Sequence, residues 1–199
     1  MSNWADAGAL SKALPPYLSE SRKGAFAEAL KDFPRAKPLY KANSDPDPLQ
    51  GDVWTGVLFL DFPYGVGRRA VGLLITNSCD ADSSNKRLYP QSLSFALAIS
   101  ADKYKAALLA AHDAAKVASH LEDVRSQRVT SMVYLPADGV LDEDRIAMLD
   151  QIQSVPISFI KEAELKRASS LSDIGFYLLA FKLSIHFCRL LEGVDRTPD

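Results

Sequence analysis

The chain has 199 residues, of which 47% are hydrophobic and 24% are charged, and its formal net charge is −2. This composition is typical of a globular protein and excludes a disordered or fibrous chain. Generic binding of nucleic acid needs many positive charges that neutralise phosphates, so the acidic balance argues against a whole surface made for nucleic acid. A local basic patch remains compatible with it.

The cysteine content and the apolar runs predict the compartment. The two cysteines, Cys79 and Cys188, form no CxxC element and are too few for a disulfide framework, so we expect reduced thiols. The first residues lack the basic stretch and apolar core of a signal peptide. The most apolar C-terminal run, residues 174–191, is interrupted by charged side chains and falls short of the ~20 apolar residues that span a bilayer. We therefore expect a cytoplasmic protein without a membrane segment.

Residues 1–48 are expected to form an N-terminal helical extension followed by a proline-rich connector. Ser19 offers an N-cap, and Phe26, Ala29 and Leu30 fall on one face of the helix that follows. Four prolines occupy the rest of the region. Because a residue before proline is pushed out of helical geometry, this part is expected to be extended and to lead into the main unit.

A series of strands is predicted from residue 51 onward. Residues 52–60 are rich in β-branched and aromatic side chains, and residues 70–75 are a short apolar run of buried-strand length. Turn residues separate these two strands. Further strands are expected at residues 92–99 and 129–135, and one or two more within residues 146–160.

Two helices accompany these strands. Residues 101–126 are predicted to be one inserted helix, because apolar side chains recur there at helical spacing. A closing helix is predicted from Leu171, with Gly193 just past its end as a C-cap. Two apolar stripes run along this helix, so it is expected to be buried on two sides, either within the fold or against a partner subunit. The stripes are Leu171, Ile174, Leu178, Phe181, Ile185 and Cys188, and Phe176, Leu179, Leu183, Phe187 and Leu190.

The order of these elements predicts the fold class. A helical lead-in, strands, an inserted helix, more strands and a closing helix indicate an α+β fold with a small, mostly antiparallel sheet or barrel. Residues 49–195 are expected to form this domain, preceded by the extension of residues 1–48.

The sequence GVGRR at residues 65–69 is the first candidate site. Its glycines precede a strand rather than a helix, whereas the dinucleotide-binding fingerprint needs the opposite order. We interpret the segment as a hairpin loop in which the glycines allow positive φ. The adjacent Arg68 and Arg69 can hold a phosphate bidentately, or they are simply a solvated pair of loop charges.

The second candidate site is the polar segment that follows the next strand. Carboxylates here can bind a divalent cation or act as a general base, and the thiol can act as a nucleophile, although no histidine lies nearby in sequence to activate it. Asn and Asp side chains also bond their own backbone and end strands, which is the structural alternative. The candidate binding residues are Asn77, Ser78, Cys79, Asp80 and Asp82.

The three histidines do not form a metal site by their spacing. His112 and His120 are eight residues apart on the predicted inserted helix, and His186 lies between two apolar stripes. We expect core or surface histidines. The sequence also predicts no metal and no cofactor, since it lacks a Walker loop, HExxH or a zinc ribbon.

Short motifs occur in a recognisable order. They are GDV at residues 51–53, GRRA at 67–70 leading into VGLLI at 71–75, DQIQSV at 150–155 and LSD at 171–173. In this order they resemble motifs of the PemK/MazF toxin family, and the resemblance covers about residues 51–191.

The resemblance implies an SH3-like β-barrel with a C-terminal helix and a homodimer. It also implies a metal-independent endoribonuclease that cleaves single-stranded RNA in a toxin–antitoxin or phage-defence setting, with an antitoxin or defence-complex protein as partner. By position, the catalytic residues would be Arg69 or Arg68 together with Ser100. An arginine would stabilise charge on the scissile phosphate, while a hydroxyl or a neighbouring base handles the 2′-OH proton.

Two other functions remain open. One is a non-catalytic barrel module that binds a partner protein, a nucleic acid or a small ligand through the region of residues 68–82. The other is a metal-assisted hydrolase that uses Asp80 and Asp82.

Overall fold

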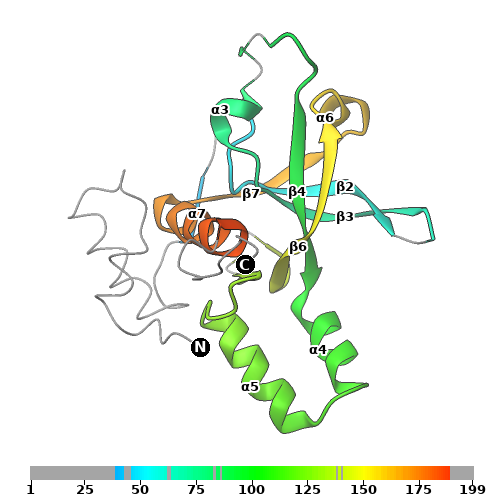
Figure 1. Ribbon diagram of the computed structural model, residues 1–199, viewed down its shortest axis with the longest axis vertical. Coiled ribbons are helices and arrows are strands. Elements are labelled where there is room, and N and C mark those ends of the chain that lie inside the picture. Colours follow the sequence, from blue (N-terminus) through cyan, green and yellow to red (C-terminus); the bar gives the residue numbers. More distant parts are fainter. Residues whose placement is uncertain are drawn as a thin grey trace, which may run out of the picture.

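The computed structural model describes residues 39–42, 46–61, 64–82, 84–85, 87–137, 139 and 141–188, and these form an α+β fold (Figure 1). The predicted N-terminal helix and Gly193 lie outside the described residues. The strands are β1 (Tyr40–Lys41), β2 (Val53–Asp61), β3 (Val66–Leu74), β4 (Ser92–Ser100), β5 (Met132–Leu135), β6 (Arg145–Pro156) and β7 (Lys166–Leu171). The helices are α3 (Ser78–Ala81), α4 (Ala101–Leu109), α5 (Ala114–Arg125), α6 (Phe159–Glu162) and α7 (Asp173–Cys188).

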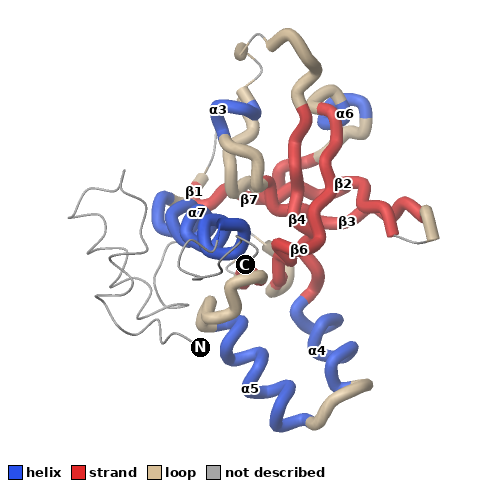
Figure 2. Tube along the Cα trace, in the orientation of Figure 1, coloured by secondary structure: helices blue, strands red, loops and turns tan. Residues whose placement is uncertain are grey.

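The strands form one antiparallel sheet of seven strands in the order β1-β7-β2-β3-β4-β6-β5. The sheet curls, so that the β2–β3 hairpin crosses the direction of β4 and β6 (Figure 2). The prediction of an α+β fold with a small, mostly antiparallel sheet is therefore confirmed.

The curled sheet has an apolar core on each face. Successive residues of a strand point to opposite faces, and in β3 Leu73 belongs to one core while Leu74 belongs to the other. The first core lies between the sheet and α7, whose Leu179 and Phe181 are almost fully buried. The second core packs under the turn around α6. Its fully buried members include Val57, Leu74, Leu93 and Phe95.

The first hairpin is longer than the apolar runs predicted. Strand β3 begins at Val66 rather than at residue 70, and its pairing with β2 continues to Asp61. Arg68 and Arg69 therefore lie within the strand, which corrects the prediction of a loop. Backbone pairing tolerates polar side chains where the strand extends beyond the core, so the apolar pattern marks only the buried half.

The turn before β2 fixes the start of the sheet. Gly51 has φ of +94°, and a Cβ at this position would lie 2.9 Å from Leu171 Cδ1. The next residue, Asp52, has no solvent exposure and accepts hydrogen bonds from the Leu49 amide at 2.9 Å and the Ser170 hydroxyl at 2.6 Å. It also forms an ion pair with Arg167 at 3.1 Å. These contacts join β2 to β7.

The predicted inserted helix of residues 101–126 is two helices, α4 and α5, which project from the sheet as a helical hairpin (Figure 1). The break falls at residues 110–113. Asp113 Oδ1 accepts hydrogen bonds from the amides of Ala115 at 2.9 Å and Lys116 at 3.3 Å and so caps α5. The apolar spacing continues across the break, which explains why it predicted one helix.

The C-terminal part of the sheet also differs from the prediction. Residues 146–160 contribute one long strand, β6, with an irregularity where its partners shift from Ala96–Ile152 to Leu97–Met148. Strand β7 was not predicted, and it takes Leu171, which the prediction placed in the closing helix. The polar sequence of β7 carries little strand signal, so its pairing with β1 and β2 decides its conformation.

The closing helix itself is confirmed as α7. It begins at Asp173, and the Ser172 hydroxyl accepts a hydrogen bond from the Gly175 amide at 3.3 Å. Within the part of the chain that the structure describes, no helix has the length and the apolar character needed to cross a membrane.

Candidate functional site

The β2–β3 hairpin projects beyond the rest of the sheet (Figure 1). Residues paired across the hairpin point to the same face, and Arg68 pairs with Phe59 while Arg69 pairs with Leu58. The two arginines, adjacent in sequence, therefore lie on opposite faces of the hairpin. They do not form one bidentate cluster.

The tip of this hairpin exposes apolar and aromatic side chains. Tyr64 is 78% exposed, Val66 is 62% exposed and Leu60 is 42% exposed. Arg68 is exposed on the same face as Val66 and forms no ion pair with any described residue. Asp61 pairs with Val66 and so shares this face. An exposed aromatic ring, an exposed guanidinium and one carboxylate therefore lie along one short hairpin.

Arg69 holds the base of the hairpin. Its Nη1 donates to the Gly56 carbonyl at 3.1 Å and to the Ala163 carbonyl at 3.3 Å. These bonds tie β3 to the irregular part of β2 and to the turn after α6. The remaining guanidinium nitrogens, Nε and Nη2, form no hydrogen bond with a described residue, so they are available for a further acceptor.

Ser100 lies at the end of β4 and caps α4. Its hydroxyl accepts a hydrogen bond from the Lys103 amide at 3.5 Å, and the residue is 5% exposed. The β3–β4 ladder has Val71 opposite Ala98. If the same register is continued by two residues, Arg69 stands opposite Ser100 and on the same face of the sheet. No side-chain bond joins them in the structure.

The second candidate segment forms the short helix α3 and the loop around it. Asn77 caps α3 through a hydrogen bond from the Cys79 amide to its Oδ1 at 2.9 Å. The Ser78 hydroxyl accepts from the Gln50 amide at 2.9 Å, and Asn85 Nδ2 donates to the Cys79 carbonyl at 2.6 Å. The Cys79 thiol is free and exposed. These hydrogen bonds hold the backbone of this segment in place and join it to Gln50.

The two carboxylates of the segment are also used by the loop. Asp80 forms an ion pair with Arg87. Asp82 accepts from the Ser84 amide at 2.7 Å, and hydrogen bonds from Ser84 lower its pKa below the ordinary 3.8. Among the described residues, no group of three or more His, Cys, Asp or Glu side chains could hold a metal ion. The metal-assisted hydrolase therefore gains no support from this geometry.

Arg87 and Tyr89 belong to the same loop and were not predicted. Arg87 Nη1 donates to the Tyr89 hydroxyl at 3.0 Å, and its guanidinium lies 5.9 Å from the centroid of the Tyr89 ring. Hydrogen bonds to Tyr89 and then to Asp80 raise the pKa of Arg87 above its ordinary value. The loop presents Leu88 and Tyr89 to solvent. The loop has no hydrophobic periodicity, so nothing in the sequence indicated that Arg87 and Tyr89 would contact each other.

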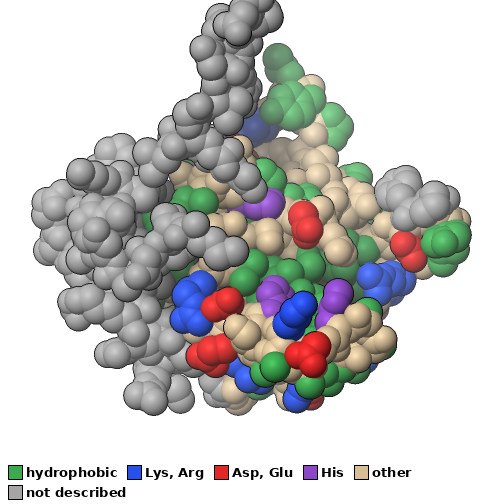
Figure 3. Space-filling view, turned by 60° about the horizontal axis from the view of Figure 1, so that its bottom comes forward, with side chains coloured by type: hydrophobic (Ala, Val, Ile, Leu, Met, Phe, Trp, Pro, Cys, Tyr) green, Lys and Arg blue, Asp and Glu red, His purple; other side chains and the backbone are tan. Residues whose placement is uncertain are grey.

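The histidines lie away from the hairpin. His120 Nε2 is 2.9 Å from the Tyr104 hydroxyl, and burial followed by the charge of Asp150 raises the pKa of that tyrosine. Figure 3 shows the face that carries the α4–α5 helical hairpin, where histidine, acidic and basic side chains are mixed among hydrophobic ones. Among the described residues of this face, the basic side chains do not gather into a patch.

Comparison with models of protein families finds no match to this chain, and comparison with curated proteins finds none either.

Proposed function

We propose that the protein is a barrel module of the PemK/MazF kind that binds single-stranded RNA through the β2–β3 hairpin. The observation that carries this proposal is that one projecting hairpin exposes both Tyr64 and Arg68. Tyr64 is 78% exposed, and Arg68 is exposed and has no ion-pair partner among the described residues.

The chemistry of the hairpin suits an unpaired strand. A base can stack on the exposed tyrosine ring, and such stacking tolerates any sequence because every base has a π-face. The guanidinium can bind a backbone phosphate through charge-assisted hydrogen bonds. Because the chain has a net charge of −2 and Asp61 lies on the same face of the hairpin as Arg68, we expect few phosphate contacts and a modest salt dependence.

The curled antiparallel sheet and the closing helix support the SH3-like barrel that the resemblance implies. On the same basis we extend the proposal to a toxin–antitoxin or phage-defence setting. There, an antitoxin or defence-complex protein and a second copy of the chain would complete the assembly.

Fluorescence anisotropy with a labelled single-stranded RNA tests the binding. Tyr64→Ala is expected to weaken binding by about 1–3 kcal/mol, the contribution of one stacked base. Arg68→Ala is expected to weaken it as well and to reduce its salt dependence by about one phosphate contact.

Two exposed residues elsewhere provide matched controls. Tyr89→Ala removes an exposed tyrosine from another loop, and Lys161→Ala removes an exposed cation from α6. Both variants are expected to bind RNA like the wild type. Equal losses in the controls, or no loss in the hairpin variants, would refute the proposed interface.

A second candidate function is metal-independent cleavage of the bound RNA. It is favoured by the matching positions of Arg69 and Ser100 beyond the last β3–β4 pair, together with the unbonded nitrogens of Arg69. Cleavage of RNA in the presence of EDTA, lost in Arg69→Ala, would support it. Cleavage that persists in Arg69→Ala would exclude the arginine assignment, and binding without any cleavage would leave the non-catalytic module.

A further inference from the structure

Lys182 is a fully buried lysine on α7. It is 1% exposed, and its Nζ donates to the carbonyls of Val129, at 2.8 Å, and Met132. Val129 lies in the connection between α5 and β5, and Met132 is the first residue of β5. A buried ammonium is costly unless a carboxylate compensates its charge, and here the partners are neutral carbonyls.

We propose that Lys182 makes the packing of α7 depend on pH. When its amine is neutral, it holds α7 against the connection between α5 and β5. When the amine is protonated, release of α7 is favoured. The neutral amine keeps two N–H groups, one for each carbonyl, and leaves no charge in the core. The protonated amine adds a third N–H and a full charge in the same apolar surroundings. Release of α7 returns that charge to water.

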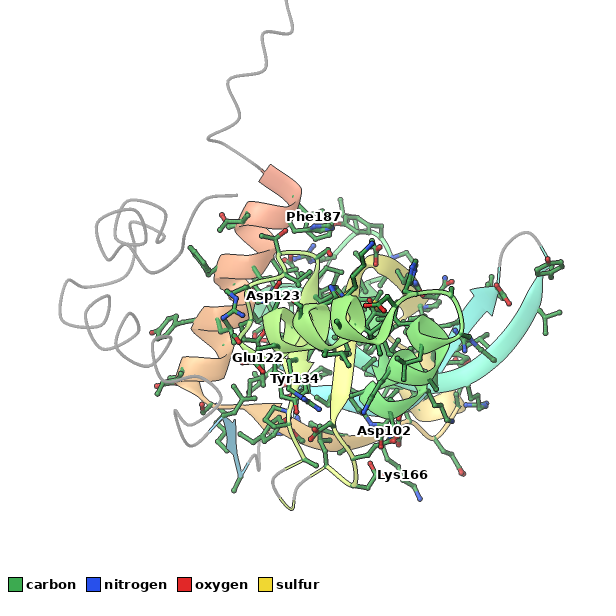
Figure 4. The ribbon with its side chains drawn as sticks, turned by 90° about the horizontal axis from the view of Figure 1, so that it is seen from below. Asp102, Glu122, Asp123, Tyr134, Lys166 and Phe187 are labelled. Atoms are coloured by element: carbon green, nitrogen blue, oxygen red, sulfur yellow. The ribbon has the colours of Figure 1, made fainter. Side chains whose placement is uncertain are left out.

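Among the described residues, no charged group takes the place of a carboxylate partner for Lys182. Burial lowers the pKa of Lys182, and no described charged group contributes to this shift. Two described acidic groups have partners of their own: Asp123 pairs with Arg128, and Asp144 accepts from the Tyr134 hydroxyl. In Figure 4, Glu122 and Asp123 lie on the end of α5 that approaches α7. The other described titratable groups on α7, β1, β7 and α5 are Asp173, Tyr177, His186, Tyr40, Lys41, Lys166, Arg167, Lys116, His120 and Arg125.

His186 lies on the same helix as Lys182, one turn after it. Its Nδ1 is buried and has no hydrogen-bond partner among the described residues. Both side chains can carry a proton, so a pH effect on α7 has to be assigned to one of them. The variant His186→Asn therefore separates the two.

The direction of the pH response follows from the two protonation equilibria. In the closed state burial lowers the pKa of Lys182 to about 7, from an ordinary value of 10.5. Between these values the released state binds one more proton than the closed state, so rising pH favours closure. The released population should fall roughly fivefold from pH 7 to 8 and roughly tenfold from pH 8 to 9, and it should level off below pH 7.

Hydrogen–deuterium exchange of the α7 amides at pH 6, 7, 8 and 9, corrected for the intrinsic exchange rate, measures this population. In the wild type, the protection of the α7 amides is expected to rise with pH, roughly fivefold from pH 7 to 8 and roughly tenfold from pH 8 to 9. Lys182→Met, which keeps the length of the side chain and cannot titrate, is expected to show protection independent of pH. Lys161→Met makes the same change at an exposed position and is expected to retain the response.

Three results would overturn the proposal. They are an unchanged pH response in Lys182→Met, loss of the response in His186→Asn instead, and titration of the wild-type Lys182 side chain above pH 9. The last is measured by NMR of the lysine ε-methylene carbons. It needs no variant, so the proposal stays testable even if Lys182→Met does not fold.

Discussion

Asp52 shows how single buried polar groups hold this sheet together. Its carboxylate has three donors, the Leu49 amide, the Ser170 hydroxyl and the Arg167 guanidinium, although the residue has no solvent exposure. Arg167 also lies 5.7 Å from the centroid of the Trp54 ring. A buried ion pair of this kind adds little net stability by itself, but removal of one partner leaves an uncompensated charge.

We predict that Asp52→Asn lowers the free energy of unfolding by about 3 kcal/mol, because Arg167 loses its compensating charge. Urea denaturation measures this change. Asp61→Asn, at an exposed position in the hairpin, should change stability by less than about 0.5 kcal/mol. Equal effects of the two substitutions would show that the Asp52 carboxylate is not a structural anchor.

For single residues, the sequence predicted which side chains are candidates for a site but not which residues they contact. Arg68, Arg69 and the polar segment at residues 77–82 stand out because they interrupt apolar runs. The acceptor of Arg69 at Ala163 is 94 residues away in sequence. Local patterns carry no information about such contacts, so whether a side chain binds its own fold or faces solvent could not be predicted.

Among the elements, those with strong apolar patterns were predictable and those held by distant partners were not. Strands β2 and β4 and helix α7 coincide with apolar runs. Strand β7 depends on pairing with β1 and β2, which are far away in the chain. The α4–α5 hairpin keeps its apolar spacing across a break that one cap, Asp113, helps to create.

We predict that Asp113→Ala lowers the free energy of unfolding by about 1 kcal/mol, since it removes the N-cap of α5. Urea denaturation gives the global effect, and hydrogen exchange should show it as faster exchange in the first turn of α5. Asp102→Ala serves as the control, because Asp102 lies in the first turn of α4 while the Ser100 hydroxyl provides that cap. A larger loss in the control would contradict the assignment of Asp113 as a cap.

The molecule as a whole combines a two-sided sheet with a hairpin that extends beyond both cores. Apolar side chains of the sheet and of α7 are buried in the two cores, whereas Tyr64, Val66 and Leu60 at the hairpin tip are exposed to solvent. Exposed apolar and aromatic side chains grouped on one projection mark an interaction site more often than scattered ones do. Together with the exposed Arg68, this grouping supports our proposal that the hairpin binds single-stranded RNA.

Photo-crosslinking of a bound single-stranded RNA, followed by mass spectrometry of the crosslinked peptides, tests this claim most directly. We expect the principal crosslinks to fall on the β2–β3 hairpin, at or beside Tyr64 and Arg68. Crosslinks confined to the loop of Arg87 and Tyr89 or to the α4–α5 helical hairpin would contradict it.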